Sequence, residues 1–283
     1  MKRNENNSLL MTISPLLYDT HMHTPLCKHA AGEPEAYAAV AEQRGLKGII
    51  ITCHNPAPNG WAAKYRMDMS QFDQYLAMVQ RARDEWRDRI DVRLGLESDY
   101  VPGVESWLET FHTRVPFHFI LGSVHATLPD YKDLYWHNDP LAYQVLYFDH
   151  LAKSAESGLF DCLSHPDLIK NMAPSTWNPQ LILDDIQRSL DRIARSGVAM
   201  ELNTSGLNKA VKEMNPGGLI LAEMRERGIP VVVGSDAHEP GRVAADFEQA
   251  FTTLQEVGYT HTSYFLDRRR IDIPLDQAIA SLA

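Results

Sequence analysis

The sequence predicts an α/β protein in which parallel strands close into a barrel as a single domain. Short apolar runs rich in β-branched residues recur along the chain, and a loop and an amphipathic helix usually follow. This alternation is typical of a parallel sheet covered by helices. The length of 283 residues also suits one α/β barrel, which takes roughly 250 residues. An open, doubly wound sheet has the same periodicity and remains the alternative.

The predicted strands are recognised by their composition and boundaries. The segment Gly-Ile-Ile-Ile-Thr-Cys at 48–53 is apolar through its middle, as expected for a strand that is buried on both faces. Seven such segments cover residues 16–18, 48–53, 92–96, 117–121, 159–163, 198–202 and 230–233, and a weaker candidate covers 262–266.

Capping signals mark the helices between these strands. Asp139 followed by Pro140 begins one helix, because Asp accepts hydrogen bonds at an N-cap and Pro fits the first turn. Ser70 is expected to cap another, with Asp73 three residues later as in a capping box, and Asn215 is expected to begin a third. The predicted helices cover residues 33–44, 70–89, 139–157, 178–197, a segment from 215 onward, and 243–257.

Composition and charge limit the possible functions. Apolar residues make up 44% of the chain and charged residues 23%, as in ordinary folded proteins. The formal net charge of −10 argues against a broad nucleic-acid-binding face. No apolar run is long enough to span a membrane, and the polar N-terminus does not resemble a signal peptide. We therefore expect a cytoplasmic protein with neither a membrane nor a nucleic-acid partner, in which residues 1–14 form a flexible tail and residues 15–283 one domain.

Three cysteines are too few and too scattered for a disulfide scaffold. Cys27, Cys53 and Cys162 each lie near a predicted strand end, and we expect them to be buried free thiols. Because Cys53 adjoins His54, a reactive thiol is the alternative at that position.

The twelve histidines are distributed unevenly over the predicted elements. Many of them follow strands at the carboxyl end, where the functional groups of α/β barrels gather. Residues two apart on a strand point the same way, so His21 and His23 can converge on one point. The nine ligand-type residues at this edge are His21, His23, His29, His54, Glu97, His125, His165, Asp236 and His238. Of the other histidines, four are expected to be surface or packing residues and His137 is left open; the four are His112, His118, His150 and His261.

This set of residues indicates a metal cluster. Any single histidine is more simply explained as a hydrogen-bonded core or rim residue. Carboxylates buried among imidazoles are costly unless a cation pairs them, and nine ligands are too many for one tetrahedral zinc ion. Mixed nitrogen and oxygen ligands suit zinc, iron or manganese. We therefore expect two or three divalent transition metals that share a bridging carboxylate.

Neighbouring metals indicate phosphoryl transfer to water. Two cations about 3.5–4 Å apart can clamp the attacking and leaving oxygens of such a reaction. The sequence has no Gly-x-Ser-x-Gly nucleophile elbow, no P-loop and no dinucleotide-binding fingerprint. Metal-assisted hydrolysis is the mechanism that remains.

Six motifs, in order, resemble those of the polymerase-and-histidinol-phosphatase (PHP) family. The resemblance implies a distorted (β/α)7 barrel, similar to a TIM barrel, with a site for three metals. Many family members have Asp before the histidine of the second motif, where this chain has Cys53. The motifs are Asp19-x-His21-x-His23, Thr52-Cys53-His54, Gly95-Leu96-Glu97, Gly122-Ser123-Val124-His125, Ser164-His165-Pro166 and Gly234-Ser235-Asp236-Ala237-His238.

The resemblance also implies how the metals share their ligands, with Glu97 as the bridge. Carried over by position, the three sets are His21, His23, Glu97 and Asp236; Glu97, His125 and His165; and His29, His54 and His238.

Within the family, the chain is most similar to the stand-alone histidinol-phosphatases of histidine biosynthesis. The similarity rests on residues 24–30, 97–100 and 165–170. It implies hydrolysis of a small phosphorylated substrate, L-histidinol phosphate, to L-histidinol and phosphate. Another phosphomonoester, such as phosphotyrosine or a nucleotide, is the nearest alternative. Two other classes are less favoured. A metal-storing module would be indicated if one of the predicted ligands were missing, and none is. A metal-dependent amidohydrolase would leave His29 and His238 without a role.

Charged residues on the loops after the strands are candidates for substrate contacts. Lys64, Arg66 and Lys170 are expected to meet the phosphate, and Asp99 the ammonium group of the substrate. Each also has a plainer explanation, as a solvated charge or as the cap of a loop.

Three of the ligand-type residues are also candidates for catalysis. Glu97 would bridge two metals, and Asp236 and His238 are candidates for the proton donor to the leaving group. Asn203 lies at the same edge of the sheet without a predicted role.

Overall fold

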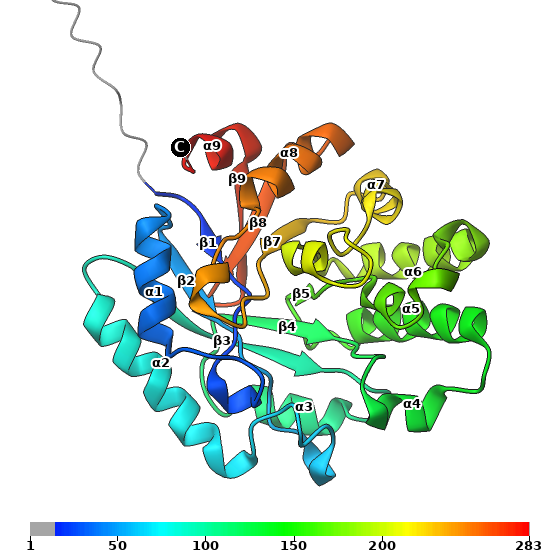
Figure 1. Ribbon diagram of the computed structural model, residues 1–283, viewed down its shortest axis with the longest axis horizontal. Coiled ribbons are helices and arrows are strands. Elements are labelled where there is room, and N and C mark those ends of the chain that lie inside the picture. Colours follow the sequence, from blue (N-terminus) through cyan, green and yellow to red (C-terminus); the bar gives the residue numbers. More distant parts are fainter. Residues whose placement is uncertain (1–14, 283) are drawn as a thin grey trace, which may run out of the picture.

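The computed structural model describes residues 15–282, and the strands in this range form one sheet of nine in sequence order (Figure 1). Neighbouring strands are parallel from β1–β2 to β7–β8, and β8–β9 is antiparallel. The predicted tail, residues 1–14, lies outside the described residues. The strands are β1 (Tyr18–Asp19), β2 (Gly48–Ile51), β3 (Asp91–Asp99), β4 (Phe119–Ser123), β5 (Cys162–Leu163), β6 (Ala199–Asn203), β7 (Val231–Gly234), β8 (His261–Leu266) and β9 (Arg269–Pro274).

Helices pack around the outside of the sheet (Figure 1). In α6 the buried residues Ile186, Leu190 and Ile193 are spaced by three and four positions, so one face of the helix is apolar and turns to the core. No helix in residues 15–282 has the length and apolar character needed to cross a membrane. The α-helices are α1 (Pro34–Gln43), α2 (Phe72–Trp86), α3 (Glu105–His112), α4 (Pro129–Tyr135), α5 (Pro140–Glu156), α6 (Leu183–Ser196), α7 (Gly218–Glu226), α8 (Phe247–Val257) and α9 (Leu275–Ala280).

The barrel closes between the segments that follow β1 and β7. Met22 and Ala237 form an isolated parallel bridge. The amide of His23 donates to the carbonyl of Ala237 at 2.9 Å, and the amide of Ala237 donates to the carbonyl of His21 at 3.0 Å. The first seven strands therefore meet at their carboxyl ends, as predicted for a barrel rather than for an open sheet.

At the amino end of the strands, the β8–β9 hairpin lies between β7 and β1 and crosses the floor of the barrel. Tyr264 of β8 stacks on Tyr18 of β1 with ring centroids 4.7 Å apart. At the turn, the amide of Arg268 donates to the carbonyl of His118 at 3.0 Å, and the Arg268 guanidinium pairs with Asp161 at 2.5 Å. The hairpin thus ties the two ends of the sheet to β4 and β5.

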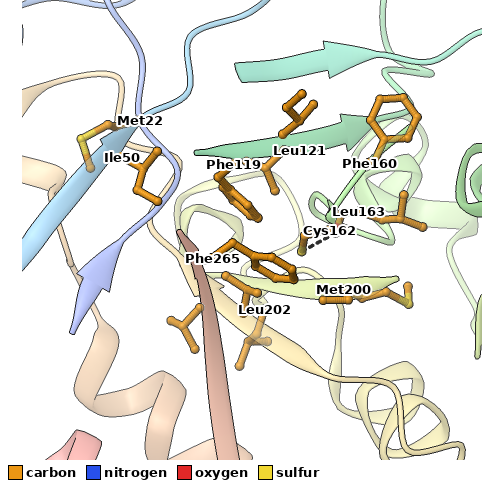
Figure 2. Close-up of a cluster of buried hydrophobic side chains, with 14 of the residues drawn as sticks. Met22, Ile50, Phe119, Leu121, Phe160, Cys162, Leu163, Met200, Leu202 and Phe265 are labelled. Carbon is orange, nitrogen blue, oxygen red and sulfur yellow. Dashed lines mark hydrogen bonds between the residues drawn. The ribbon is translucent and has the colours of Figure 1, made fainter. Parts of the chain in front are cut away.

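The interior of the barrel above this hairpin is apolar. Figure 2 shows Phe119 of β4 facing Phe265 of β8, and these two rings are stacked with centroids 5.3 Å apart. Leu121 and Leu202, from β4 and β6, are completely buried in the same cluster. This packed centre separates the floor from the site at the carboxyl ends.

Several predicted boundaries are wrong, each for a local reason. The capping box before α2 is made by Asp68 and Gln71, not by Ser70 with Asp73, so a 3₁₀ turn at Met69–Gln71 precedes the helix. Asn215 does not begin a helix, because its backbone pairs with Asn203, and α7 starts at Gly218. The helix predicted from 243 starts at Phe247, after a separate 3₁₀ turn at Pro240–Arg242. Four elements, α3, α4, β9 and α9, were not predicted from the sequence.

Candidate metal centre

The nine ligand-type residues converge at the carboxyl ends of the strands. Glu97 lies near the end of β3, and His54 pairs with it through an isolated parallel bridge just after β2. His165 and Asp236 follow β5 and β7 with positive φ angles of 29° and 51°. Such backbone conformations are uncommon outside glycine, although Asp and His adopt them more readily than most residues, and they recur at functional sites. His29 is brought to the group by a 3₁₀ turn at Pro25–Cys27.

Glu97 is at the centre of the group and is completely buried. Its Oε2 lies 2.7 Å from Nδ1 of His54, and its Oε1 lies 3.0 Å from Nε2 of His165. Burial by itself would raise the pKa of the Glu97 carboxyl, but the imidazoles of His54, His21 and His125 hold it well below its usual range. Glu97 is therefore ionised, and its two oxygens face different imidazoles.

Asp236 forms a second centre of negative charge beside Glu97. Its Oδ1 lies 3.1 Å from Nε2 of His23 and 3.5 Å from Nε2 of His21. Burial would raise the pKa of Asp236, but Lys209, His21 and His23 hold it well below its usual range. Two ionised carboxylates thus share one buried cluster of imidazoles.

In four histidines of the cluster, Nδ1 hydrogen-bonds a carboxylate or carbonyl oxygen. A carboxylate or carbonyl oxygen can only accept, so Nδ1 donates and the Nε2 lone pair is left for another partner. This is the arrangement that orients metal-ligating histidines in proteins. The four bonds are His21 to Glu201 at 2.7 Å, His29 to the carbonyl of Cys27 at 2.7 Å, His125 to Asp99 at 2.5 Å, and His238 to the carbonyl of Asp236 at 3.0 Å.

The inward-facing atoms of the cluster fit bound divalent cations. Within residues 15–282, Nε2 of His21, Nε2 of His238 and Oε2 of Glu97 are buried without a hydrogen bond of acceptable geometry. Buried polar atoms are normally satisfied, and a metal ion would satisfy these. Several groups of three have ligand atoms within 4.8 Å of one another: His21, His23 and Asp236; His54, Glu97 and His125; and His23, His54 and His238.

Two cysteine thiols lie directly beside the cluster. Cys27 and Cys53 are free and buried, as predicted, and their sulfur atoms lie within 4.8 Å of a ring nitrogen of His23. Thr24 donates to Sγ of Cys53 from its amide at 3.4 Å and from its hydroxyl at 3.2 Å. At position 53 the chain therefore holds a thiol that accepts two hydrogen bonds, and the imidazole of the next residue, His54, joins the cluster.

Of the predicted substrate contacts, Arg66 lines the cavity in front of the cluster. This cavity has a volume of about 480 Å³. Arg66 is buried and donates from Nε and Nη2 to Asp99, the second bond being 2.8 Å long. Asp99 is therefore occupied by Arg66 and His125. Burial by itself would raise the pKa of the Asp99 carboxyl, but Arg66 and His125 keep it below the usual range. Its position is that of an orienting carboxylate rather than of an open ammonium site.

Lys170 and Lys64 do not reach the cavity. Lys170 is completely buried, and its ammonium group donates to the carbonyl of Met214 at 2.7 Å, to Asp167 at 3.1 Å and to Glu213 at 3.3 Å. All three of its N–H groups are thus used inside the protein. Lys64 is exposed on the loop before Arg66 and is not part of the cavity wall. The contacts of Lys170 contradict its predicted role at the substrate, whereas for Lys64 that role stays a prediction.

Three residues around the cluster, Glu201, Ser205 and Lys209, were not predicted from the sequence. Glu201 accepts hydrogen bonds from His21 and from the amide of His165, the latter at 2.9 Å. Ser205 and Lys209, on the loop after β6, line the cavity beside Asp236. Glu201 did leave a signal, because it is the one charged residue in an otherwise apolar predicted strand at 198–202.

A parallel barrel that gathers histidines and carboxylates at the carboxyl ends of its strands is the arrangement of a metal-dependent hydrolase. The PHP domain family model matches residues 19–205. The chain therefore belongs to the PHP domain family, as its six motifs predicted.

Among its relatives is the probable histidinol-phosphatase of Deinococcus radiodurans, which is 38% identical over 248 residues, covering 86% of this chain and 94% of that protein. The histidinol-phosphatase of Bacillus subtilis is 26% identical over 264 residues, covering 81% of this chain and 96% of that protein. The crystal structure of the histidinol phosphate phosphatase of Lactococcus lactis with zinc, L-histidinol and phosphate superposes with a TM-score of 0.75 at 19% identity, covering 90% of this chain and 98% of that one. This likeness confirms the predicted fold, a distorted TIM barrel.

Proposed function

We propose that this chain is a histidinol-phosphatase, which hydrolyses L-histidinol phosphate to L-histidinol and phosphate with bound divalent metals. The observation that carries the proposal is the buried ligand cluster around Glu97. Oxygen acceptors hold several of its histidines, and Nε2 of His21 and Oε2 of Glu97 lack a hydrogen-bond partner within residues 15–282. Similarity to histidinol-phosphatases over most of both chains supports the choice of substrate. A cytoplasmic location is part of the same proposal.

We assign three metal positions, with Glu97 as the bridge between two of them. Its Oε1 lies 3.0 Å from Nε2 of His165 and 3.6 Å from Nε2 of His125. Its Oε2 lies 3.5 Å from Nε2 of His21 and 3.6 Å from Nε2 of His23, so one carboxylate can serve two cations. Zinc, iron and manganese all suit mixed imidazole and carboxylate ligands. The assigned sets are those implied by the PHP motifs: His21, His23, Glu97 and Asp236; Glu97, His125 and His165; and His29, His54 and His238.

Divalent cations at such a site supply an activated water and neutralise the charge of the phosphoryl oxygens. The chain contributes the geometry. Asp99 holds the ring of His125 and the guanidinium of Arg66, so that Arg66 can turn its remaining N–H to a phosphoryl oxygen. Burial and His23 lower the pKa of His238 to about 3, so His238 is neutral at pH 7. A neutral imidazole and an ionised carboxylate both suit metal ligands, so neither His238 nor Asp236 is assigned as the proton donor to the leaving group.

A phosphatase of different specificity is the alternative, acting on phosphotyrosine or on a nucleotide. We would measure kcat/KM for L-histidinol phosphate, p-nitrophenyl phosphate, a phosphotyrosine peptide and a nucleoside monophosphate, with metal content determined on the same samples. If the fully metal-loaded protein hydrolyses p-nitrophenyl phosphate but not histidinol phosphate, the proposed substrate is wrong and the assignment as a metal-dependent phosphatase still holds.

The bridging role of Glu97 has its own test. Glu97→Ala should remove metal from two of the sites together and lower kcat/KM by more than about 100-fold, because even groups that only orient ligands are worth about 10- to 100-fold. Glu256→Ala, at an exposed position on α8, is the matched control. Retention of full metal content by Glu97→Ala would refute the bridge.

A further inference from the structure

Lys209 lies on a loop after β6 whose two ends are joined. The backbones of Asn203 and Asn215 exchange hydrogen bonds of 2.7 and 3.0 Å. The amide of Lys209 donates to the carbonyl of Gly206 at 3.0 Å. A Cβ atom on Gly206 would lie 2.3 Å from the carbonyl oxygen of Glu213, so the loop folds tightly on itself. The backbone of Lys209 is therefore held in one place relative to the cavity.

The ammonium group of Lys209 stands at the cavity wall beside Asp236. Nζ lies 3.2 Å from Oδ2 of Asp236 and also donates to the hydroxyl of Ser205. The Lys209 side chain is 28% exposed, and it lines the same cavity as His29 and His238. An ammonium group has three N–H donors. These contacts use two of them, and one remains for a ligand in the cavity.

The charge of Lys209 is less fully neutralised than that of Arg66, the other permanent cation among the cavity-lining residues described by the structure. Arg66 is paired through two nitrogens with Asp99. The carboxylate beside Lys209 is Asp236, which also faces His21 and His23 and which we assign to a metal. A metal cation bound to Asp236 would neutralise much of the negative charge of that carboxylate. The positive charge of Lys209 would then remain available to attract an anion.

We propose that the ammonium group of Lys209 binds a phosphoryl oxygen of the substrate from the cavity wall. The one carboxylate that it contacts among the described residues is Asp236, which we assign to a metal. The proposal rests on the proposed function, since it names a further substrate-binding residue of the same site. The plainer explanation is that Lys209 only ties its loop to Asp236. In that case its loss would disturb metal binding and stability, and the affinity for phosphate would fall only in parallel with the loss of metal.

The probe is inorganic phosphate, titrated calorimetrically into metal-loaded protein. Lys209→Gln should weaken phosphate binding about 10- to 100-fold, as expected for a charge-assisted hydrogen bond. Lys209→Arg should restore part of the loss. Lys212→Gln changes an exposed lysine three residues further along the same loop and should bind like the wild type. Metal content and the melting temperature of each variant would be measured on the same preparations.

Unchanged phosphate affinity in Lys209→Gln would overturn the proposal, and so would a loss of affinity that only parallels a loss of metal. Phosphate binding by the wild type together with a selective loss in Lys209→Gln would support it. Failure of the metal-loaded wild type to bind phosphate or to hydrolyse p-nitrophenyl phosphate would instead overturn the proposed function itself. The two failures are therefore distinguishable.

Discussion

The imidazole of His21 donates from Nδ1 to Oε1 of Glu201 across 2.7 Å, and both side chains are completely buried. Glu201 also accepts from the amide of His165 at 2.9 Å and from the side chain of Asn203 at 2.9 Å. One carboxylate thus fixes the ring of one proposed ligand and the backbone of another. It connects them to Asn203, whose side chain accepts from the amide and hydroxyl of Ser205.

Glu201→Gln should lower metal affinity by about 10- to 100-fold, the usual effect of losing an orienting carboxylate. A glutamine amide would turn its NH2 group toward either the His21 ring N–H or the His165 amide, which are both donors. Metal content after dialysis against a weak chelator would measure the effect. Glu256→Gln on the surface of α8 serves as the control. Wild-type affinity in Glu201→Gln would show that the packing around His21 alone is sufficient.

Gly234→Ala should reproduce this effect without altering a charge. A Cβ atom at position 234 would lie 2.1 Å from Oε1 of Glu201 and 2.9 Å from Cβ of His21. Both side chains would have to move, and fully buried residues have little room to do so. We expect reduced metal content together with a lower melting temperature. Gly241→Ala is the control, since nothing lies within 4 Å of an added Cβ atom there.

Asp99→Asn tests whether Asp99 orients the site or meets the ammonium group of the substrate. The change leaves the buried guanidinium of Arg66 without its charged partner, which typically costs about 3–5 kcal/mol in the free energy of unfolding. It also loosens His125. We therefore expect similar losses of kcat/KM for histidinol phosphate and for p-nitrophenyl phosphate, which has no amine. A loss confined to histidinol phosphate would favour the ammonium contact.

The sequence was sufficient to predict the barrel and the positions of the ligand-type residues because both depend on local patterns. An apolar run followed directly by histidine places that side chain at the carboxyl edge wherever the strand lies in the sheet. The network behind the ligands depends on distant pairs. Glu201 and His21 are 180 positions apart, and no local pattern connects them.

The sequence was misleading where a charged residue could lie on either side of a loop. Lys170 is three residues after Asp167, and that buried carboxylate, together with the carbonyl of Met214, draws the ammonium inward.

The β8–β9 hairpin was incompletely predicted because the second strand, β9, is largely exposed and rich in charge. Its alternation of residues does not resemble that of a buried parallel strand.

His112 should make the protein less stable as the pH falls from about 6.5 to about 4. Burial, with the nearby charge of Arg268, lowers the pKa of His112 to about 4 from an ordinary value of 6.5. The unfolded chain then binds a proton more readily than the folded one. The contribution of His112 is therefore present above pH 6.5 and is lost as the pH falls through the window, by up to about 3 kcal/mol.

Denaturant unfolding of His112→Gln and of the wild type at several pH values would measure this. The wild-type curve should fall more steeply between pH 6.5 and pH 4, because the variant lacks the titrating group. His261→Gln, at an exposed position at the start of β8, should follow the wild type. Parallel curves for the wild type and His112→Gln would contradict the prediction.

Arg268→Ala should destabilise the fold while leaving the chemistry intact. Arg268 pairs with Asp161, which is almost buried, and donates to the carbonyl of Leu159 at 3.0 Å. Without Arg268, the Asp161 carboxylate keeps the amide of Ile120 as a donor at 2.8 Å but loses its only charge partner among the residues described here. Leaving a buried group poorly satisfied costs about 1–3 kcal/mol.

Arg270→Ala is the matched control on the same hairpin, since the pair of Arg270 with Asp272 is largely exposed and such pairs contribute about 0–1 kcal/mol. Urea unfolding of both variants gives the comparison, and kcat/KM at full metal loading should be unchanged in each. If Arg268→Ala is no less stable than Arg270→Ala, the hairpin is held by its apolar face alone. If kcat/KM falls in Arg268→Ala at unchanged metal content, the packed interior between Phe265 and the cluster transmits movement from the floor of the barrel to the site.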